Sequence, residues 1–408
     1  MQAQSHPDDS IPRARPAPSR PVANKSVSFS LLIVVGALII YGVSREWSYL
    51  TRTLIPQITQ SVTVSFGPRV TPTPAVYEQS NRETLEDVFL SYDDQGVIVT
   101  DRSTLRSQRL VKAIAPTRIV RAMPGGQEVV LTQQVADEQS VSVYTLSTQS
   151  ATELFRFLPS ANGVSFEKQV SVSPSGRYIA YSHGAGDLSL YDRTAGENRL
   201  LVLGRPCDDG AGDDCSGYFE PQWSPDGEQL LVNKRINDSS TLVVLRPFSQ
   251  PMESDDLRLA GRDGVWLPSN TAVVAAGEYE NLYYLGHFSD VTATSLLAKY
   301  FSTDPIRVGT LALSAHTQVA FAYTQSPAVD EAPALGLYDI KTQRFEVLDT
   351  GRKGQRWEVL EWIDETQEVV VRVRDDDRVS YAVYATQRDA RHELLIPGEY
   401  GMVVGQAQ

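Results

Sequence analysis

Histidine and cysteine are scarce in this sequence, and their scarcity excludes several kinds of site. The five histidines never occur at the short spacings of a zinc site, and the His-Glu-x-x-His motif is absent. The Gly-x-Ser-x-Gly nucleophile elbow and the glycine-rich phosphate-binding loops are missing too. The sequence therefore predicts no catalytic residues, no metal and no cofactor, and a protein that is not an enzyme.

The sequence also has fewer basic than acidic residues and few helical patterns. Lys and Arg number 37 against 50 Asp and Glu, which gives a net charge of −13. An acidic domain is poorly suited to nucleic acid or anionic lipid headgroups, so neither is predicted as its ligand. Acidic solubility is the simpler reason for this charge. Runs of Glu, Lys, Leu and Ala at helical spacing are nearly absent beyond residue 81, which favours an all-β domain.

A tight turn followed by a short aliphatic run recurs six times, at intervals of roughly 40–50 residues. The turns lie at residues 123–126, 173–176, 224–227, 267–270, 314–317 and 363–366. Each is followed by a second run rich in Val, Leu and Tyr, and several by a polar hairpin and a third run. A repeat of this length built from short strands is typical of a β-propeller blade, whereas recurring hairpins of a β-sandwich are the alternative.

A seventh unit is divided between the two ends of the domain. Residues 96–102 and 108–111 match the later half of a repeat, and residues 88–90 add a strand before them. Residues 401–404 are strand-like and can supply the missing strand, which would remove the open edges of the ring. The prediction is a single all-β propeller over residues 82–408, with seven blades, or alternatively six or eight, closed by strands from both ends.

Residues 27–43 form an uncharged apolar stretch near the lower length limit for crossing a bilayer. The segment before it, 1–26, is net basic and is expected to be a disordered cytoplasmic tail. The positive-inside bias then predicts a single-pass signal anchor in the cell membrane, with the propeller extracytoplasmic. A cleaved signal peptide is the alternative, and it leaves the propeller on the same side. Residues 44–81 are predicted to be an extracytoplasmic juxtamembrane segment and a Pro/Thr-rich stalk.

The two cysteines, Cys207 and Cys215, are close in sequence and would lie in an oxidising compartment. They are predicted to form a local disulfide, with two free thiols as the alternative. Four carboxylates lie between them and could contact a partner or hold calcium, although a solvated acidic loop is the simpler reading. These residues are Asp208, Asp209, Asp213 and Asp214.

A second charged cluster is expected at a hairpin tip of the last repeat. Its members carry both signs of charge, so self-neutralising surface charge is one reading and contact with a partner is the other. They are Arg372, Arg374, Asp375, Asp376, Asp377 and Arg378.

Residues 173–181, Ser-Pro-Ser-Gly-Arg-Tyr-Ile-Ala-Tyr, and 223–231, Trp-Ser-Pro-Asp-Gly-Glu-Gln-Leu-Leu, resemble the TolB-like, WD-repeat-like propeller signature. The resemblance implies a protein-binding ring of the bacterial envelope; related propellers also guard the active site of prolyl-oligopeptidase-type peptidases. This chain differs from both, because an anchor and stalk replace the additional α/β domain of TolB and no hydrolase domain is present. The predicted function is a non-catalytic, membrane-tethered propeller that binds protein partners, as an accessory or scaffold subunit of an envelope or membrane complex. The alternative is a small-molecule- or glycan-binding, conceivably enzymatic, propeller that uses its central channel.

Overall fold

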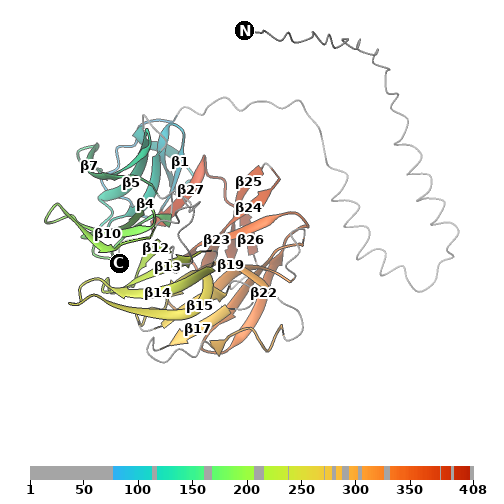
Figure 1. Ribbon diagram of the computed structural model, residues 1–408. Coiled ribbons are helices and arrows are strands. Elements are labelled where there is room, and N and C mark those ends of the chain that lie inside the picture. Colours follow the sequence, from blue (N-terminus) through green and yellow to red (C-terminus); the bar gives the residue numbers. More distant parts are fainter. Residues whose placement is uncertain are drawn as a thin grey trace, which may run out of the picture. The chain divides into compact units, whose positions relative to one another are not determined.

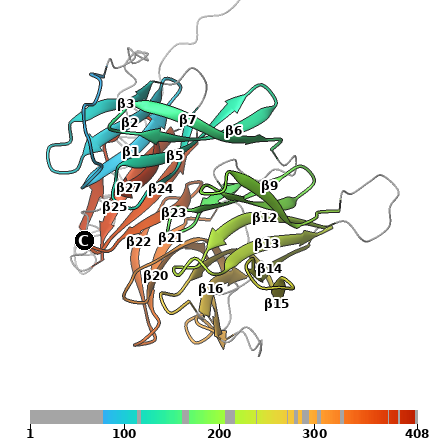
Figure 2. The same cartoon turned by 90° about the vertical axis from the view of Figure 1, so that its left-hand side faces the viewer.

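Seven four-stranded antiparallel blades surround a central axis in the structure, which is a computed structural model (Figures 1 and 2). It describes residues 77–404 except 113–116, 160–167, 206–215, 238, 271, 278–281, 287–293, 302–305, 326–330, 377 and 387–389. These described residues contain no α-helix. The predicted all-β propeller of seven blades is therefore confirmed. The predicted tail, membrane span and most of the stalk lie outside the described residues.

The first blade contains three consecutive strands and the last strand of the chain, whereas the second and third blades each contain four consecutive strands. The first blade contains β27 (Glu399–Val404), β1 (Val88–Asp93), β2 (Gly96–Asp101) and β3 (Ser107–Lys112). The second contains β4 (Thr117–Ala122), β5 (Glu128–Val135), β6 (Glu138–Thr145) and β7 (Ser150–Phe157). The third contains β8 (Val170–Val172), β9 (Tyr178–His183), β10 (Asp187–Asp192) and β11 (Glu197–Val202).

The fourth and fifth blades share one long strand, and the last two repeat the simple pattern. The fourth contains β12 (Ser216–Trp223), β13 (Leu230–Ile236), β14 (Ser239–Arg246) and the first half of β15 (Glu253–Trp266). The fifth contains the second half of β15, β16 (Ala272–Gly277), β17 (Leu282–Gly286) and β18 (Thr294–Ser295). The sixth contains β19 (Arg307–Leu313), β20 (Gln318–Thr324), β21 (Ala334–Asp339) and β22 (Arg344–Thr350). The seventh contains β23 (Arg356–Ile363), β24 (Glu368–Asp375), β25 (Arg378–Ala385) and β26 (Ala390–Glu393).

The recurring turn joins the first strand of a blade to its second and has the same geometry in all six copies. Its fourth residue donates its backbone N–H to the carbonyl of its first and has a positive φ. The fourth residues are Gly126, Gly176, Gly227, Asn270, Thr317 and Gln367. The last turn is therefore 364–367, one residue later than the predicted 363–366, because the side chain of Ile363 is buried at the end of β23.

Thr317 offers a stability test of this turn, because a β-branched residue is strained at φ 72° and glycine is not. Thr317→Gly is expected to raise the free energy of unfolding by about 1 kcal/mol, measured by chemical denaturation. The matched control is Gly227→Thr, where φ is 76° and stability should fall. Equal stability of Thr317→Gly and the parent protein would contradict the shared geometry.

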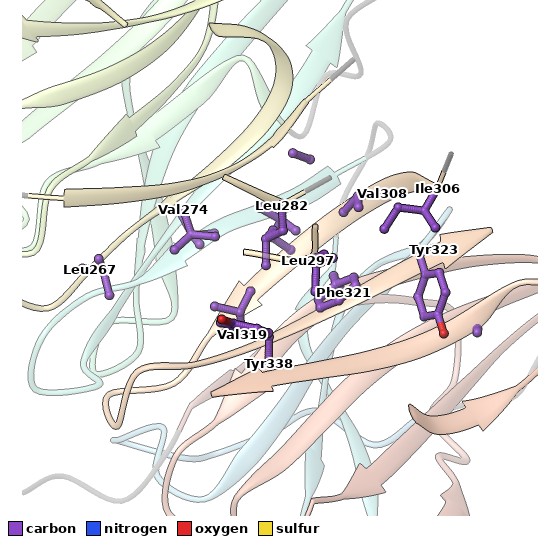
Figure 3. Close-up of a cluster of buried hydrophobic side chains, with 14 residues drawn as sticks. Leu267, Val274, Leu282, Leu297, Ile306, Val308, Val319, Phe321, Tyr323 and Tyr338 are labelled. Carbon is purple, nitrogen blue, oxygen red and sulfur yellow. The ribbon is translucent and has the colours of Figure 1, made fainter. Parts of the chain in front are cut away.

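The hydrophobic core consists of seven clusters, one at each interface between neighbouring blades, among the residues that the structure describes. Figure 3 shows the cluster between the fifth and sixth blades, where Val274 and Leu282 face Val319 and Phe321. The middle strands of each blade carry aliphatic side chains on both faces because both faces are covered by other blades. The ring is thus stabilised by blade-to-blade burial.

The first strands of the blades form the inner ring, where they contact one another. Side chains of these strands also donate hydrogen bonds to the backbone of the preceding or following inner strand. Trp223 Nε1 donates to the Ser171 carbonyl at 3.2 Å, and Trp266 Nε1 donates to the Gln222 carbonyl at 3.1 Å. Arg121 Nη1 donates to the Val172 carbonyl at 3.0 Å. These bonds fix the spacing of the inner strands around the axis.

The ring closes through β27, which pairs antiparallel with β1, as the sequence predicted. Figures 1 and 2 show this last strand, in red, beside the blue first strand. On its other side β27 is held by Glu361 of β23, whose Oε2 accepts hydrogen bonds from Tyr400 Oη at 2.7 Å and from the Val403 N–H at 2.9 Å. Closure therefore depends on a carboxyl group as well as on strand pairing.

Candidate functional site

The inner strands of the third to sixth blades enclose two adjoining cavities of about 220 Å³ and about 620 Å³. Both are lined by Lys168, Glu220, Asn233 and Asp263. The larger cavity also reaches Arg235 and the residues around Arg307, in the sixth blade. We call this set of residues the channel cluster. Volumes of a few hundred Å³ with several converging polar groups are typical of small-molecule sites.

A shared position in the repeat explains why polar side chains meet here. Four residues before the first residue of each turn, the fourth to sixth blades carry Glu220, Asp263 and Thr310, which all line the larger cavity. The equivalent residue of the third blade, Gln169, lines neither cavity, and that of the second blade is the apolar Ile119. Irregular pairing, typical of a β-bulge, accompanies this position in β12, β15 and β19, and also in β4 and β23. Bulges redirect side chains and are common beside functional sites.

Glu220 lies at the bulge of β12 with a positive φ of 54°. This backbone conformation is costly for a residue other than glycine and is often retained at binding sites. Burial raises the pKa of the Glu220 carboxyl, and Asp263 raises it further, whereas Lys168 and a hydrogen bond from Asn233 lower it. Asn233 is itself buried and accepts a hydrogen bond from Ser240 Oγ.

Asp263 is the second carboxyl group of the cluster and lies on the inner half of β15. Its Oδ1 accepts the backbone N–H of Gly264 at 3.0 Å, and its Oδ2 lies 4.0 Å from Lys168 Nζ. Burial raises the pKa of the Asp263 carboxyl, and the opposing effect of Lys168 is smaller. Two carboxyl groups therefore lie near two cations, Lys168 and Arg235, and Lys168 Nζ is beyond hydrogen-bond distance of Asp263.

One cationic side chain, Arg307, lies at the other end of the larger cavity, whereas Arg235 lies close enough to Glu220 to lower the pKa of its carboxyl. Arg307 is exposed and forms no ion pair with any residue that the structure describes. Arg235 lies over the ring of Phe219, with its guanidinium carbon 5.0 Å from the ring centroid. A third cavity of about 470 Å³ begins at Arg307 and continues past Tyr323 to Trp357. The channel cluster therefore has an acidic end and a basic end.

The chemistry available in this arrangement is the binding of a charged, polar molecule. Within the described ranges, no group of three or more His, Cys, Asp or Glu residues could hold a metal ion. Sequence reasoning did not find the channel cluster. The signal that could have shown it is the polar cavity-lining residue at one fixed position in three consecutive repeats, Glu220, Asp263 and Thr310.

The predicted disulfide and its acidic loop lie outside the described residues. Their flanks are described: Arg205 and Ser216 form an antiparallel bridge, with N···O distances of 2.6 Å and 3.1 Å. The residues that flank the segment 206–215 are thus joined by backbone hydrogen bonds. The disulfide and the calcium or partner role of Asp208, Asp209, Asp213 and Asp214 stay predictions.

The structure separates the predicted charged hairpin into a buried residue and an exposed tip. Arg372 is buried within β24, where its Nη1 lies 3.0 Å from Glu358 Oε2. Arg374, Asp375, Asp376 and Arg378 are exposed around the turn from β24 to β25, and Asp377 is outside the described residues. The tip lies beside the third cavity, because Gln355, which lines that cavity, donates its Nε2 to Asp375 Oδ2 at 2.9 Å.

None of the described residues forms a helix that is both long and apolar enough to cross a membrane. The predicted span, 27–43, is outside them.

No family model and no curated protein matches the chain. Among solved structures, the tricorn protease matches with a TM-score of 0.54 and 9% identity, over 84% of this chain and 37% of that one. An oligogalacturonate lyase in complex with manganese matches with a TM-score of 0.53 and 10% identity, over 78% and 85%. With the seven blades, these matches support the β-propeller fold that was predicted from the turns.

TolB from Acinetobacter baumannii matches with a TM-score of 0.45 and 13% identity, over 78% of this chain. This chain spans 64% of the length of that TolB structure.

Proposed function

We propose that the protein is a non-catalytic, membrane-tethered, extracytoplasmic propeller that binds a protein partner through the face that carries the β24–β25 tip. The observation that supports this most directly is the tip itself. The described residues between Arg374 and Ser380 are all exposed, and the exposed fraction of Val379 is 52%. An exposed charged hairpin on a rigid scaffold, beside a cavity, is suited to specific recognition.

Site-specific photo-crosslinking in membranes tests this proposal. A photoreactive amino acid at Val379 is expected to capture a defined protein partner from the native host. The same amino acid at Leu200 is the control, because Leu200 has the same 52% exposure and lies on the outer strand β11. Equal capture at both positions, or capture at Leu200 alone, would contradict the proposed face.

The tether is supported by the uncharged stretch 27–43 and the basic segment before it. The full chain is expected to stay in the membrane after alkaline carbonate washing. Val35→Asp should release a large share of it, because a carboxylate at the centre of a span costs about 2.5–3.5 kcal/mol. Release of the unaltered chain by carbonate would count against a retained anchor.

A second function, the binding of a small molecule or glycan in the central channel, is favoured by the channel cluster. One similar structure is an oligogalacturonate lyase in complex with manganese. This chain has no three-ligand acidic or histidine cluster among its described residues, so we propose binding in the channel without a role for manganese.

A further inference from the structure

The larger cavity has opposite charges at its two ends, and this polarity indicates what it binds. Glu220 and Asp263 lie at the end that is shared with the smaller cavity. Arg307 lies at the end that is shared with the third cavity. A ligand that spans the larger cavity would therefore meet carboxyl groups at one end and a guanidinium at the other.

At the acidic end, two carboxyl groups line the cavity beside Lys168 and Arg235. Lys168 Nζ is 4.0 Å from Asp263 Oδ2, which is longer than a hydrogen bond, and its side chain is 39% exposed. Burial raises the pKa of both carboxyl groups, and Lys168 acts in the opposite direction on both. A ligand ammonium group would donate charge-assisted hydrogen bonds to both carboxylates.

The basic end has a cation that is available for a ligand. Arg307 is exposed and has no ion pair with a described residue, and a guanidinium binds a carboxylate with two parallel hydrogen bonds. In the wall of the same cavity, the buried Oγ1 of Thr310 has no hydrogen-bond partner within the described part of the chain. Thr310 also lines the larger cavity, so a polar ligand could satisfy this hydroxyl.

We propose that the channel cluster binds a small zwitterion, with its ammonium group against Glu220 and Asp263 and its carboxylate against Arg307. Free amino acids and short peptides share this chemistry, and a cavity of about 620 Å³ has room for either. The inference goes beyond the proposed protein partner and does not depend on it, because binding can be measured on the protein alone.

Isothermal titration calorimetry on the full chain in detergent tests the ligand class. The probes are a set of free α-amino acids and a set of dipeptides, with N-acetylated, C-amidated dipeptides, succinate and putrescine as controls. At least one zwitterion is expected to bind at least tenfold more tightly than every control. The set that binds distinguishes the amino acid from the peptide. No binding of either set, or equal binding of succinate or putrescine, would overturn the proposal.

Two variants test the assigned orientation. Arg307→Gln is expected to weaken the zwitterion at least tenfold and to leave the binding of its decarboxylated amine unchanged. Asp263→Asn should weaken both the zwitterion and the amine. Arg344→Gln is the control, because Arg344 is exposed on β22, away from the cavities, and should change neither. Thermal unfolding of each variant verifies folding. Unchanged zwitterion affinity in folded Arg307→Gln would refute the orientation.

Discussion

Removal of residues 399–408 is expected to destabilise the propeller more than any single substitution discussed above. The deletion removes β27, so β1 loses its inner partner and the cluster between the seventh and first blades loses Tyr400 and Val403. Each of these buried side chains contributes about 1.5–3 kcal/mol, and the two together about 3–6 kcal/mol. That is comparable with the whole stability of many domains.

Chemical unfolding of the full chain in detergent measures this loss, and a synthetic peptide provides the control. A peptide of residues 396–408, added to the truncated protein, is expected to restore much of the lost stability because it can pair with β1. A peptide in which Tyr400 and Val403 are replaced by Asp should not. If the truncated protein unfolds at the same denaturant concentration as the parent, β27 does not hold the ring closed.

Replacement of Glu361 by Gln is expected to change how stability depends on pH. Burial raises the pKa of the Glu361 carboxyl to about 7, against a usual value of 4.5, and Glu365 raises it further. The Tyr400 hydroxyl, the Val403 N–H and Arg102 act in the opposite direction. The folded protein therefore binds more protons than the unfolded chain between these two values. Its stability is greatest below about pH 4.5 and falls as the pH rises through about 7.

At pH 8 the parent protein carries the full cost of the buried charge, which is about 3 kcal/mol for a shift from 4.5 to about 7. Glu361→Gln removes this cost and keeps both hydrogen bonds, since one oxygen accepts them both. The variant is expected to be more stable than the parent at pH 8, and its stability should decline less between pH 5 and pH 8. Denaturant unfolding at the two pH values measures both effects.

Two further variants make this prediction specific. Tyr400→Phe removes a hydrogen-bond donor that favours the charged form of Glu361. The pKa of the Glu361 carboxyl should therefore rise further, and the decline in stability should shift to a higher pH. Glu346→Gln changes an exposed carboxylate on β22 and should leave the pH profile as it is in the parent. A parallel profile for Glu361→Gln and the parent would show that Glu361 does not titrate in this range.

The fold could be predicted from sequence because its information is local and repeated. Four of the six turns pair a residue suited to positive φ, such as Gly176 or Gly227, with a following run of aliphatic residues. The last two copies have Thr317 and Gln367 at this position, and the absence of a Gly or Asn marker explains why the last turn was predicted one residue too early. Closure by β27 was predictable because the first repeat lacked a strand.

The candidate site could not be predicted in the same way, because its residues come from four different blades. Lys168, Glu220 and Asp263 carry no motif in their own neighbourhoods. Their proximity depends on the curvature of the ring and on bulges, which no short stretch of sequence encodes. The charged loops were selected from the sequence because their charged residues are consecutive. Such a run need not lie wholly in a loop, because Arg372, at one end of its run, is a buried strand residue.

The continuous strand β15 limits where the chain could be opened in a circular permutant. Between most neighbouring blades a connecting segment intervenes, so new chain ends placed there would interrupt no strand. Between the fourth and fifth blades the same strand pairs with β14 and with β16. A circular permutant opened within β15 should fold far less well than one opened between β7 and β8, and a protease should cut this junction slowly.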